Sequence, residues 1–192
     1  MTNVFVGHKL VDKCEKKARD MVGGRWGVGN RHHTKKYSKE SLISMQAAGF
    51  IAECAMCIFL KLDPFEKLNW KITQADPGYD IKLDTGTTID VKSSTHPGAR
   101  RLIWPVRNVH KLPHAADILV LAIVPGGRRQ PLGQTVTFKG YIERDRFIGM
   151  HWKAQGVRGI VDGSPYMDEK QLYNMDGLLQ HAKDIKTTAE RN

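Results

Sequence analysis

One segment of the chain combines two carboxylates and a lysine in a pattern that suits metal binding. Two short strand-like runs, PGYDIKL and TTIDVK, flank the loop at 84–86, with Asp80 in the first run and Asp90 and Lys92 in the second. A three-residue hairpin loop commonly ends on a residue in the left-handed region, which favours Gly86 at that position. This loop length sets Asp80 opposite Asp90.

Because side chains alternate along a strand, this register puts both Asp and Lys92 on one face and the isoleucines on the other. Opposed residues have Cβ atoms about 4.5–5.5 Å apart, and two carboxylates at that distance repel. A divalent cation would offset the repulsion, and carboxylate oxygens favour Mg²⁺, with Mn²⁺ as a substitute. A one-residue shift would separate the acids and expose the isoleucines. Three other acid-x-Lys pairs, Glu15/Lys17, Asp168/Lys170 and Asp184/Lys186, lie in charged helical stretches and favour solvated faces.

A third acid, Glu53, lies in an apolar stretch at 41–60 that carries no other charge. The stretch is long enough to be considered as a membrane span, but Ser44, Gln46 and the ionised glutamate are costly in lipid. The core helix of a soluble protein is therefore favoured, with no membrane as a partner. A helix packed on the hairpin's sheet would bring Glu53 to the metal, whereas a hydrogen-bonded core glutamate is the alternative.

The order of these residues resembles the PD-(D/E)XK nuclease superfamily. That family's core has an acid on a helix, then a hairpin that carries Asp and (Asp/Glu)-x-Lys, then a helix and further strands. Glu53 matches the helix acid. Asp80, Asp90 and Lys92 match the hairpin motif.

The resemblance implies an α/β fold, restriction-endonuclease-like, with a mixed β-sheet flanked by helices. It covers about residues 38–145, by the order of elements rather than by close identity. One departure is that Pro77, the nearest proline, is separated from the motif Asp by Gly78 and Tyr79.

The roles that the resemblance implies are those of a Mg²⁺-dependent nuclease, with DNA favoured over RNA. Asp80, Asp90 and the backbone carbonyl of Val91 would hold Mg²⁺, which polarises the scissile phosphate and lowers the pKa of a bound water. Lys92 would orient that water or stabilise the developing negative charge. Glu53 would complete the site directly or through water. The alternative for Lys92 is a simple ion pair with Asp90.

The elements that must position these residues follow from the hydrophobic pattern. Ser38 is a suitable N-cap for the apolar helix, which is expected to end before Asp63-Pro64. A continuous apolar run at 115–124 suits a strand buried on both faces, and 134–147 favours another strand. The remaining expected elements are strands at 69–74, 79–83 and 87–93 and helices at 4–21 and 168–185.

The 192-residue chain has a formal net charge of +10, concentrated in residues 1–40, which hold ten Lys and Arg against four Asp and Glu. A basic balance favours a polyanionic partner, nucleic acid first. We therefore divide the chain into a basic N-terminal arm or helix with a Gly-rich connector, 1–37, and a nuclease-like domain, 38–192. The residues expected to contact nucleic acid are Lys35, Lys36, His96, Arg100 and Arg101.

The cysteines and histidines favour no further chemistry. Three cysteines are too few for a disulfide scaffold, and no secretory signal is found, so a reducing, cytoplasmic compartment is expected. Cys54-x-x-Cys57 on an apolar helix favours core packing over redox or zinc chemistry. The histidine pairs at 32–33 and 110/114 lack a cysteine or acid at zinc-ligand spacing.

Two other functions stay open on the sequence alone. One is a nuclease-like fold that grips nucleic acid or a protein partner without cleaving it. The other is a small basic structural or ribonucleoprotein component whose hairpin acids are merely solvated. The sequence also leaves open whether the nucleic acid is cut internally or from an end, and what the oligomeric state is. Relatives that cut duplexes often act as pairs of subunits, which is compatible with a homodimer here.

Overall fold

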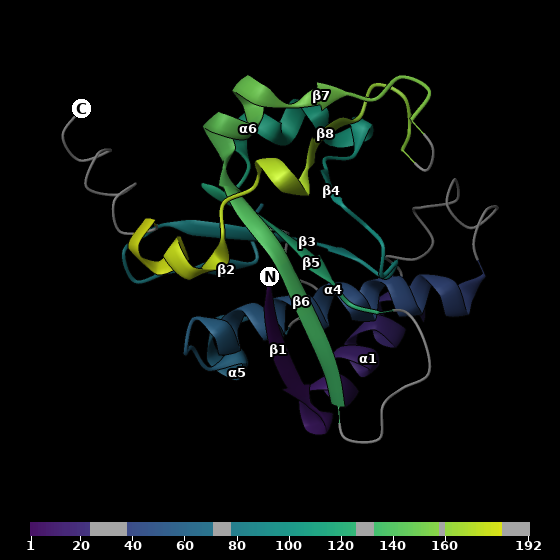
Figure 1. The fold of residues 1–192 in the computed structure, drawn as a ribbon. Helices are drawn as coiled ribbons and strands as arrows, with labels where there is room; N and C mark the ends of the chain where they lie inside the picture. The colour runs from purple at the N-terminus through teal and green to yellow at the C-terminus, as the bar shows by residue number, and fades with distance from the viewer. Residues whose placement is uncertain (24–37, 71–77, 126–132, 158–159, 182–192) are drawn as a thin grey trace.

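A five-stranded mixed sheet forms the centre of the fold in the computed structural model, which describes residues 1–23, 38–70, 78–125, 133–157 and 160–181 (Figure 1). The strand order is β1-β6-β5-β3-β2; β3 and β5 are parallel, and the other neighbours are antiparallel. The expected mixed α/β class is therefore confirmed. The strands are β1 (Thr2–Gly7), β2 (Ile81–Lys82), β3 (Thr88–Ser94), β5 (Ile118–Ile123) and β6 (Gly133–Glu143).

Two helices cover one face of this sheet and form the main core with it. α4 (Lys39–Phe59) begins at the predicted N-cap Ser38, whose Oγ accepts a hydrogen bond from the Ser41 amide at 3.1 Å. α1 (His8–Gly23) packs beside it, and both bury apolar side chains against the sheet. α4 is also long and apolar enough to cross a membrane, but half of that stretch is buried inside the fold. This is the packing expected of a core helix in a soluble protein.

A second sheet covers the opposite face. Its three strands pair antiparallel in the order β4-β8-β7, and its buried residues Leu102 and Met167 share a cluster with Leu119 of β5. Figure 1 shows this layer above the large sheet and α1 and α4 below it. The elements of the layer are β4 (Arg101–Ile103), the 3-10 helix η1 (Val106–His114), α6 (Arg144–Met150), β7 (Trp152–Lys153) and β8 (Pro165–Asp168).

The N-terminal residues differ from the expectation of one helix over 4–21. β1 occupies the first part of that range and pairs with β6 along its length, and the helix starts only at His8. Val4 and Val6 point into the core while Phe5 is exposed, which is the alternation of an edge strand. Residues 2–23, expected as a basic arm or helix, thus supply a strand and a helix to the main core. The Gly-rich connector with Lys35 and Lys36 lies outside the described residues.

The helix predicted over 168–185 is wrong for residues 168–177. β8 ends at Asp168, which begins η2 (Glu169–Gln171) with a capping box, and η3 (Met175–Gly177) follows. Between these turns, Tyr173 exchanges backbone hydrogen bonds of 2.8 and 3.1 Å with Tyr141 of β6. The apolar spacing that indicated a helix comes from side chains that pack on the sheet. Residues 182–185 lie outside the described residues.

Two further predictions of strands were too long. One expected strand is absent from the residues of its range that the structure describes, and the other ends early. α5 (Pro64–Lys67) follows α4, with Asp63 as its N-cap, and the next residues, 69–70, form no strand. The rest of that expected strand, 71–74, lies outside the described residues. The strand expected over 134–147 ends at Glu143, where α6 begins.

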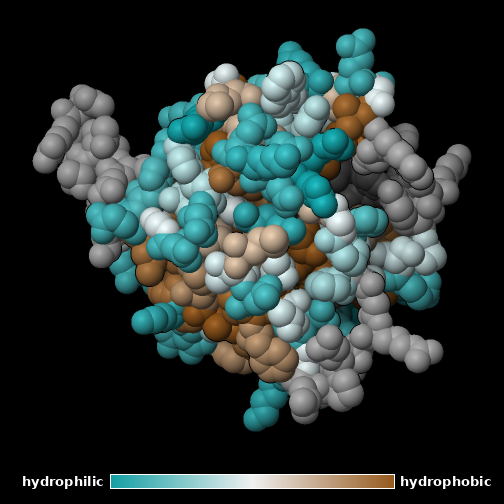
Figure 2. Space-filling model, in the orientation of Figure 1, coloured by the Kyte–Doolittle hydropathy of each residue, from teal (hydrophilic) through white to brown (hydrophobic). Residues whose placement is uncertain are grey.

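Hydrophobic surface gathers in one region of the face drawn in Figure 2, at the lower left, where Figure 1 places α5 and β1. The large exposed apolar residues of these two elements are Phe65 and Phe5. The remainder of this face is mainly hydrophilic.

Candidate active site

The β2–β3 hairpin has the predicted register at Ile81 and Lys82, but the predicted pairing of Asp80 with Asp90 is absent because the ladder ends at Ile81. Ile81 pairs with Ile89, and both are fully buried in the core beneath α1 and α4. Gly86 has φ +88°, the left-handed conformation required at the end of the loop. Asp90 and Lys92 alternate with the buried residues, so they point toward the layer that contains the small sheet.

Asp90 and Lys92 form an ion pair at the border of the second core. Lys92 Nζ lies 2.5 Å from Asp90 Oδ2, and the aspartate side chain is only 10% exposed. The ammonium also lies over the ring of Trp104, 4.6 Å from its centroid. The carboxylate and the indole together hold the lysine in one position.

Asp80 lies just beyond the end of β2, at the edge of β3. Ladder pairing ends at Ile81; the Asp80 amide donates to the carbonyl of Ile89 at 2.9 Å, and Asp80 Oδ2 accepts from the amide of Val91 at 2.7 Å. The carboxylate therefore takes the position that a further β2 residue would have in the ladder. The N–H and C=O of one strand residue point to the same edge. The Val91 carbonyl is thus on the edge where the Asp80 carboxylate lies.

Three carboxylates interact electrostatically at this edge. Burial raises the pKa of Asp80 well above its usual range, and the charges of Glu53 and Asp90 raise it further. The hydrogen bond from the Val91 amide and the charge of Lys92 act in the opposite direction. Glu53 comes from α4 and Asp90 from β3, so the fold gathers all the predicted acids into one electrostatic cluster.

The donor set of this cluster fits a hard divalent cation. Burial is the main cause of the raised pKa of Asp80, and the charges of Glu53 and Asp90 add to it; a bound cation would offset the part that comes from these charges. Two carboxylates and one carbonyl are oxygen ligands of the kind that Mg²⁺ binds. Within the described ranges, no three His, Cys, Asp or Glu side chains already surround one point as a metal site. Mg²⁺ commonly uses only one or two carboxylates and keeps several waters.

Lys17 of α1 belongs to the same cluster, although the sequence analysis interpreted it as part of a solvated face. Its Nζ donates to the carbonyl of Asn69 at 2.5 Å and lies 3.8 Å from the ring centroid of Phe50. Burial lowers the pKa of Lys17, and the charges of Glu53 and Asp80 act in the opposite direction. The one sequence signal for its burial was its position, because Lys17 directly precedes Ala18 of the apolar helical pattern, which is buried in the structure.

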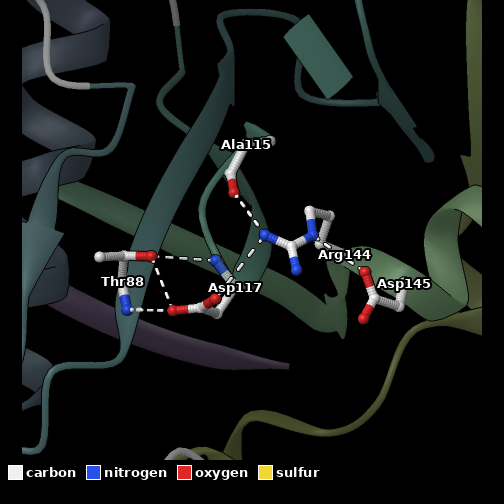
Figure 3. Close-up of polar contacts among 5 residues, drawn as sticks. All are labelled: Thr88, Ala115, Asp117, Arg144 and Asp145. Atoms are coloured by element: carbon white, nitrogen blue, oxygen red, sulfur yellow. Dashed lines mark hydrogen bonds and ion pairs between the residues drawn. The ribbon is translucent and has the colours of Figure 1, made fainter. Parts of the chain in front are cut away.

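A polar clamp that the sequence analysis also missed holds the start of β3, two residues before Asp90 (Figure 3). The amide and Oγ1 of Thr88 both donate to Asp117 Oδ2 at 2.8 Å, and the Asp117 amide donates to Thr88 Oγ1 at 3.0 Å. Arg144 joins the clamp by donating to the carbonyl of Ala115 at 3.0 Å and lies 3.8 Å from Asp117 Oδ1. The clamp fixes where β5 pairs with β3 and therefore where Asp90 lies.

The described basic residues predicted to contact nucleic acid follow β3 directly. His96 and Arg100 are exposed in the connection between β3 and β4. Arg101 is half-buried, with its guanidinium 5.5 Å from the ring centroid of Tyr166. All three therefore follow, in the chain, the strand that carries the Asp90–Lys92 pair, and Arg101 already belongs to the small sheet.

All three cysteines are free and buried, as the core-packing interpretation expects. Cys14 Sγ and Cys54 Sγ lie 3.5 Å apart, where α1 meets α4. Burial raises the pKa of the Cys57 thiol to about 12. A thiol with this pKa is a poor nucleophile near neutral pH, which fits a packing role for Cys57.

No protein-family model matches the chain, and no curated protein or solved structure matches it either. The resemblance to the PD-(D/E)XK superfamily therefore stays a prediction that rests on the residues described above.

Proposed function

We propose that the protein is a metal-dependent nuclease with a restriction-endonuclease-like fold, which hydrolyses phosphodiester bonds in DNA rather than RNA. The observation that carries the proposal is the electrostatic cluster of Glu53, Asp80 and Asp90. It is supported by Lys92, which is bonded to Asp90 on the strand that the motif requires.

In this proposal, Asp80, Asp90 and the carbonyl of Val91 hold Mg²⁺ or, as a substitute, Mn²⁺. The bound ion supplies a Lewis acid for the scissile phosphate and a water of lowered pKa. Lys92 donates hydrogen bonds to the attacking water or to the negative charge that develops on the phosphate. Glu53 accepts a hydrogen bond from water at the other side of the cluster.

The proposal extends to setting and assembly. Three free, buried thiols are compatible with a reducing, cytoplasmic compartment, which is where we propose that the nuclease acts. A homodimer would supply two such sites for the two strands of a duplex. Sedimentation of the protein with and without DNA measures that state.

A cleavage assay tests the proposal. Purified protein is mixed with linear, circular and single-stranded DNA and with RNA, in Mg²⁺, Mn²⁺ or EDTA. We expect metal-dependent cutting of DNA and a loss of about 100-fold or more in the Asp90→Asn and Lys92→Ala variants. Asp84→Asn and Lys82→Ala are matched controls, because both residues lie in the same hairpin with exposed side chains. Absence of cutting in every metal, or unchanged cutting by Asp90→Asn, refutes the nuclease.

A nuclease-like module that binds nucleic acid or a protein without cleaving is the second candidate. It is favoured by the partners that the two acids already have: Lys92 at 2.5 Å from Asp90, and the Val91 amide at 2.7 Å from Asp80. It predicts salt-dependent nucleic-acid binding in EDTA that survives Asp80→Ala. Binding of this kind without any cutting would select it.

A further inference from the structure

The outer face of the small sheet carries a row of large side chains. Ile103, Tyr166 and Trp152 are cross-strand partners, one from each of β4, β8 and β7. The adjacent residues Leu102 and Met167 are fully buried against the large sheet. Because side chains alternate, the row points away from that core. Trp152 at its end is 60% exposed.

Arg101 adds a cation to this row. It precedes Ile103 by two residues on β4, so it lies on the same face, with its guanidinium 5.5 Å from the ring centroid of Tyr166. Its Nε is buried and has no hydrogen-bond acceptor within the described part of the chain. A buried donor without an acceptor is costly, and rotation of the half-buried side chain toward an acceptor on a bound ligand would recover that cost.

The cations in and around the row are Arg101, Arg100 and Lys153, and they favour an anionic ligand. Lys153 on β7 and Arg100 next to β4 are exposed at the rim of the sheet, where alternation turns them away from the row, and Arg100 Nε lies 3.8 Å from Glu169 Oε1. The one acid on the three strands, Asp168, is occupied as the N-cap of η2. Phosphates are attracted to such a surface, and every nucleobase has a flat face that stacks on exposed aromatic rings. The combination of the exposed Trp152, the half-buried Tyr166 and a guanidinium whose Nε lacks an acceptor fits a single strand better than a duplex, whose bases are already stacked.

The row is connected to the candidate active site through Trp104. This residue directly follows Ile103, and its amide donates to the carbonyl of Pro165 in β8 at 2.8 Å. Its ring lies 4.6 Å from the ammonium of Lys92. β4 is the edge strand of the small sheet. A nucleic acid that lies across the row therefore has to pass around only this β-strand to reach Lys92.

We propose that this outer face binds single-stranded nucleic acid, with bases stacked on Trp152 and Tyr166 and a phosphate or base edge held by Arg101. The binding itself is independent of catalysis. The role of the surface, which is to hold a single strand beside the cutting site, rests on the proposed nuclease function.

Equilibrium binding of a fluorescein-labelled oligothymidylate of about 15 nucleotides to the full chain tests the proposal. EDTA is present throughout, so that no strand is cut. Trp152→Ala should weaken binding about 5- to 150-fold, the effect of losing one stacked base. Trp152→Phe should restore most of the affinity. An abasic oligonucleotide with the same number of phosphates should bind the parent and Trp152→Ala alike.

Phe5→Ala is the matched control, because Phe5 is an aromatic residue of similar exposure, 53%, on β1 at the far edge of the large sheet. Its affinity should stay within about twofold of the parent. Arg101→Met keeps the aliphatic stem and removes the charge. The plot of log affinity against log salt concentration should therefore become less steep, with the magnitude of its slope reduced by about one. Circular dichroism of each variant verifies that the fold is intact.

Two results overturn the proposal. One is a parent chain that does not bind the oligothymidylate, and the other is Trp152→Ala binding as tightly as the parent, which assigns the affinity to phosphate contacts elsewhere. Failure of the nuclease function gives a different pattern, in which strand binding depends on Trp152 while no metal supports cutting. If DNA is cut in the presence of metal while Trp152→Ala leaves the affinity for the oligothymidylate unchanged, the proposed binding surface is rejected and the nuclease function is retained.

Discussion

Replacing Asp117 with alanine should destabilise the protein by more than its partial exposure suggests. Its Oδ2 accepts two hydrogen bonds of 2.8 Å from Thr88, and its side chain is 32% exposed. Hydrogen bonds to a charged group contribute about 1.5–3 kcal/mol each, and the nearby Arg144 adds less than about 1 kcal/mol. Water replaces part of this loss at a site that is one-third exposed. The free energy of unfolding should therefore fall by about 2–4 kcal/mol.

Urea unfolding followed by circular dichroism measures this loss, and the slope with urea should be unchanged if only stability is affected. Tm should fall by about 4–16 °C, since 1 kcal/mol corresponds to about 2–4 °C in a protein of this size. Thr88→Val removes the hydroxyl but keeps the amide, and should cost about 1–2 kcal/mol. The double variant should cost at least about 1 kcal/mol less than the sum of the two, because the residues share their hydrogen bonds.

The clamp itself supplies the control. Asp145 lies 2.9 Å from Arg144 in the same network, but its side chain is 80% exposed (Figure 3). Asp145→Ala should therefore cost no more than about 0.5 kcal/mol. If Asp117→Ala costs as little as Asp145→Ala, the hydrogen bonds to Thr88 do not hold β3 in register, and the reasoning is refuted.

Three further changes have effects whose signs follow from the structure. Asp80→Asn should raise the Tm of the metal-free protein at neutral pH. The pKa of Asp80 is raised in the folded state, so its contribution to stability is complete below the pKa of the unfolded state, about 3.9, and is lost as pH rises through the folded pKa. Asparagine carries no charge and removes this loss. Mg²⁺ should raise Tm for the parent and not for this variant, and a lower Tm of the variant in EDTA contradicts the prediction. The Cys57 thiol, with a pKa of about 12, should resist dithionitrobenzoate at pH 8 until the protein unfolds, and its contribution to stability should decline from about pH 9 upward. Cys57→Ala should make the decline with pH smaller without abolishing it, because the hydrogen bond to Cys14 and burial also raise the pKa of the Cys54 thiol. Gly140→Ala should cost about 1–3 kcal/mol, since its φ is +156° and a Cβ would lie 2.6 Å from the Tyr173 carbonyl; Gly149→Ala, where nothing lies within 4 Å, should be neutral or stabilising by comparison.

The hairpin was predictable because two independent local signals agreed on one register. The position of Gly86 set the loop, and the alternation of Ile81 and Ile89 set the buried face. α4 was predictable for a similar reason, since the cap at Ser38 and the apolar run mark the same boundary. Where cap, turn and periodicity point the same way, tertiary contacts have little left to change.

β1 and the C-terminal turns were missed because tertiary packing overrode a weak local pattern. Phe5 puts an apolar side chain on the outer face of β1, which hides the alternation of Val4 and Val6. At the other end, the caps Asp168 and Asn174 each begin a short turn, and this interrupts a spacing that otherwise suits a helix. In both segments the deciding partner is β6, which is distant in sequence.

Lys17 and Asp117 were missed for a different reason, because neither belongs to a sequence motif. Lys17 bonds to Asn69 across 52 positions, and Asp117 bonds to Thr88 across 29. A charged residue in a helix or before a strand is usually solvated. Only the packing of α1 on α4, and of β5 beside β3, turns these two into parts of the candidate site and its support.

The convergence of the acids depends on where β2 ends. Glu53 comes from the helix that covers one face of the large sheet, whereas Asp90 and Lys92 point to the opposite face. Side chains on opposite faces are separated by the strands themselves, so they can interact with one group only at an edge. β2 is paired over only Ile81–Lys82, and beyond it the Asp80 carboxylate bonds to the amide of Val91. If β2 pairing continued, backbone would occupy this edge and keep a cation or phosphate from the Val91 carbonyl. The spacing of the motif can be read along the chain, but this early end of a strand is a tertiary property.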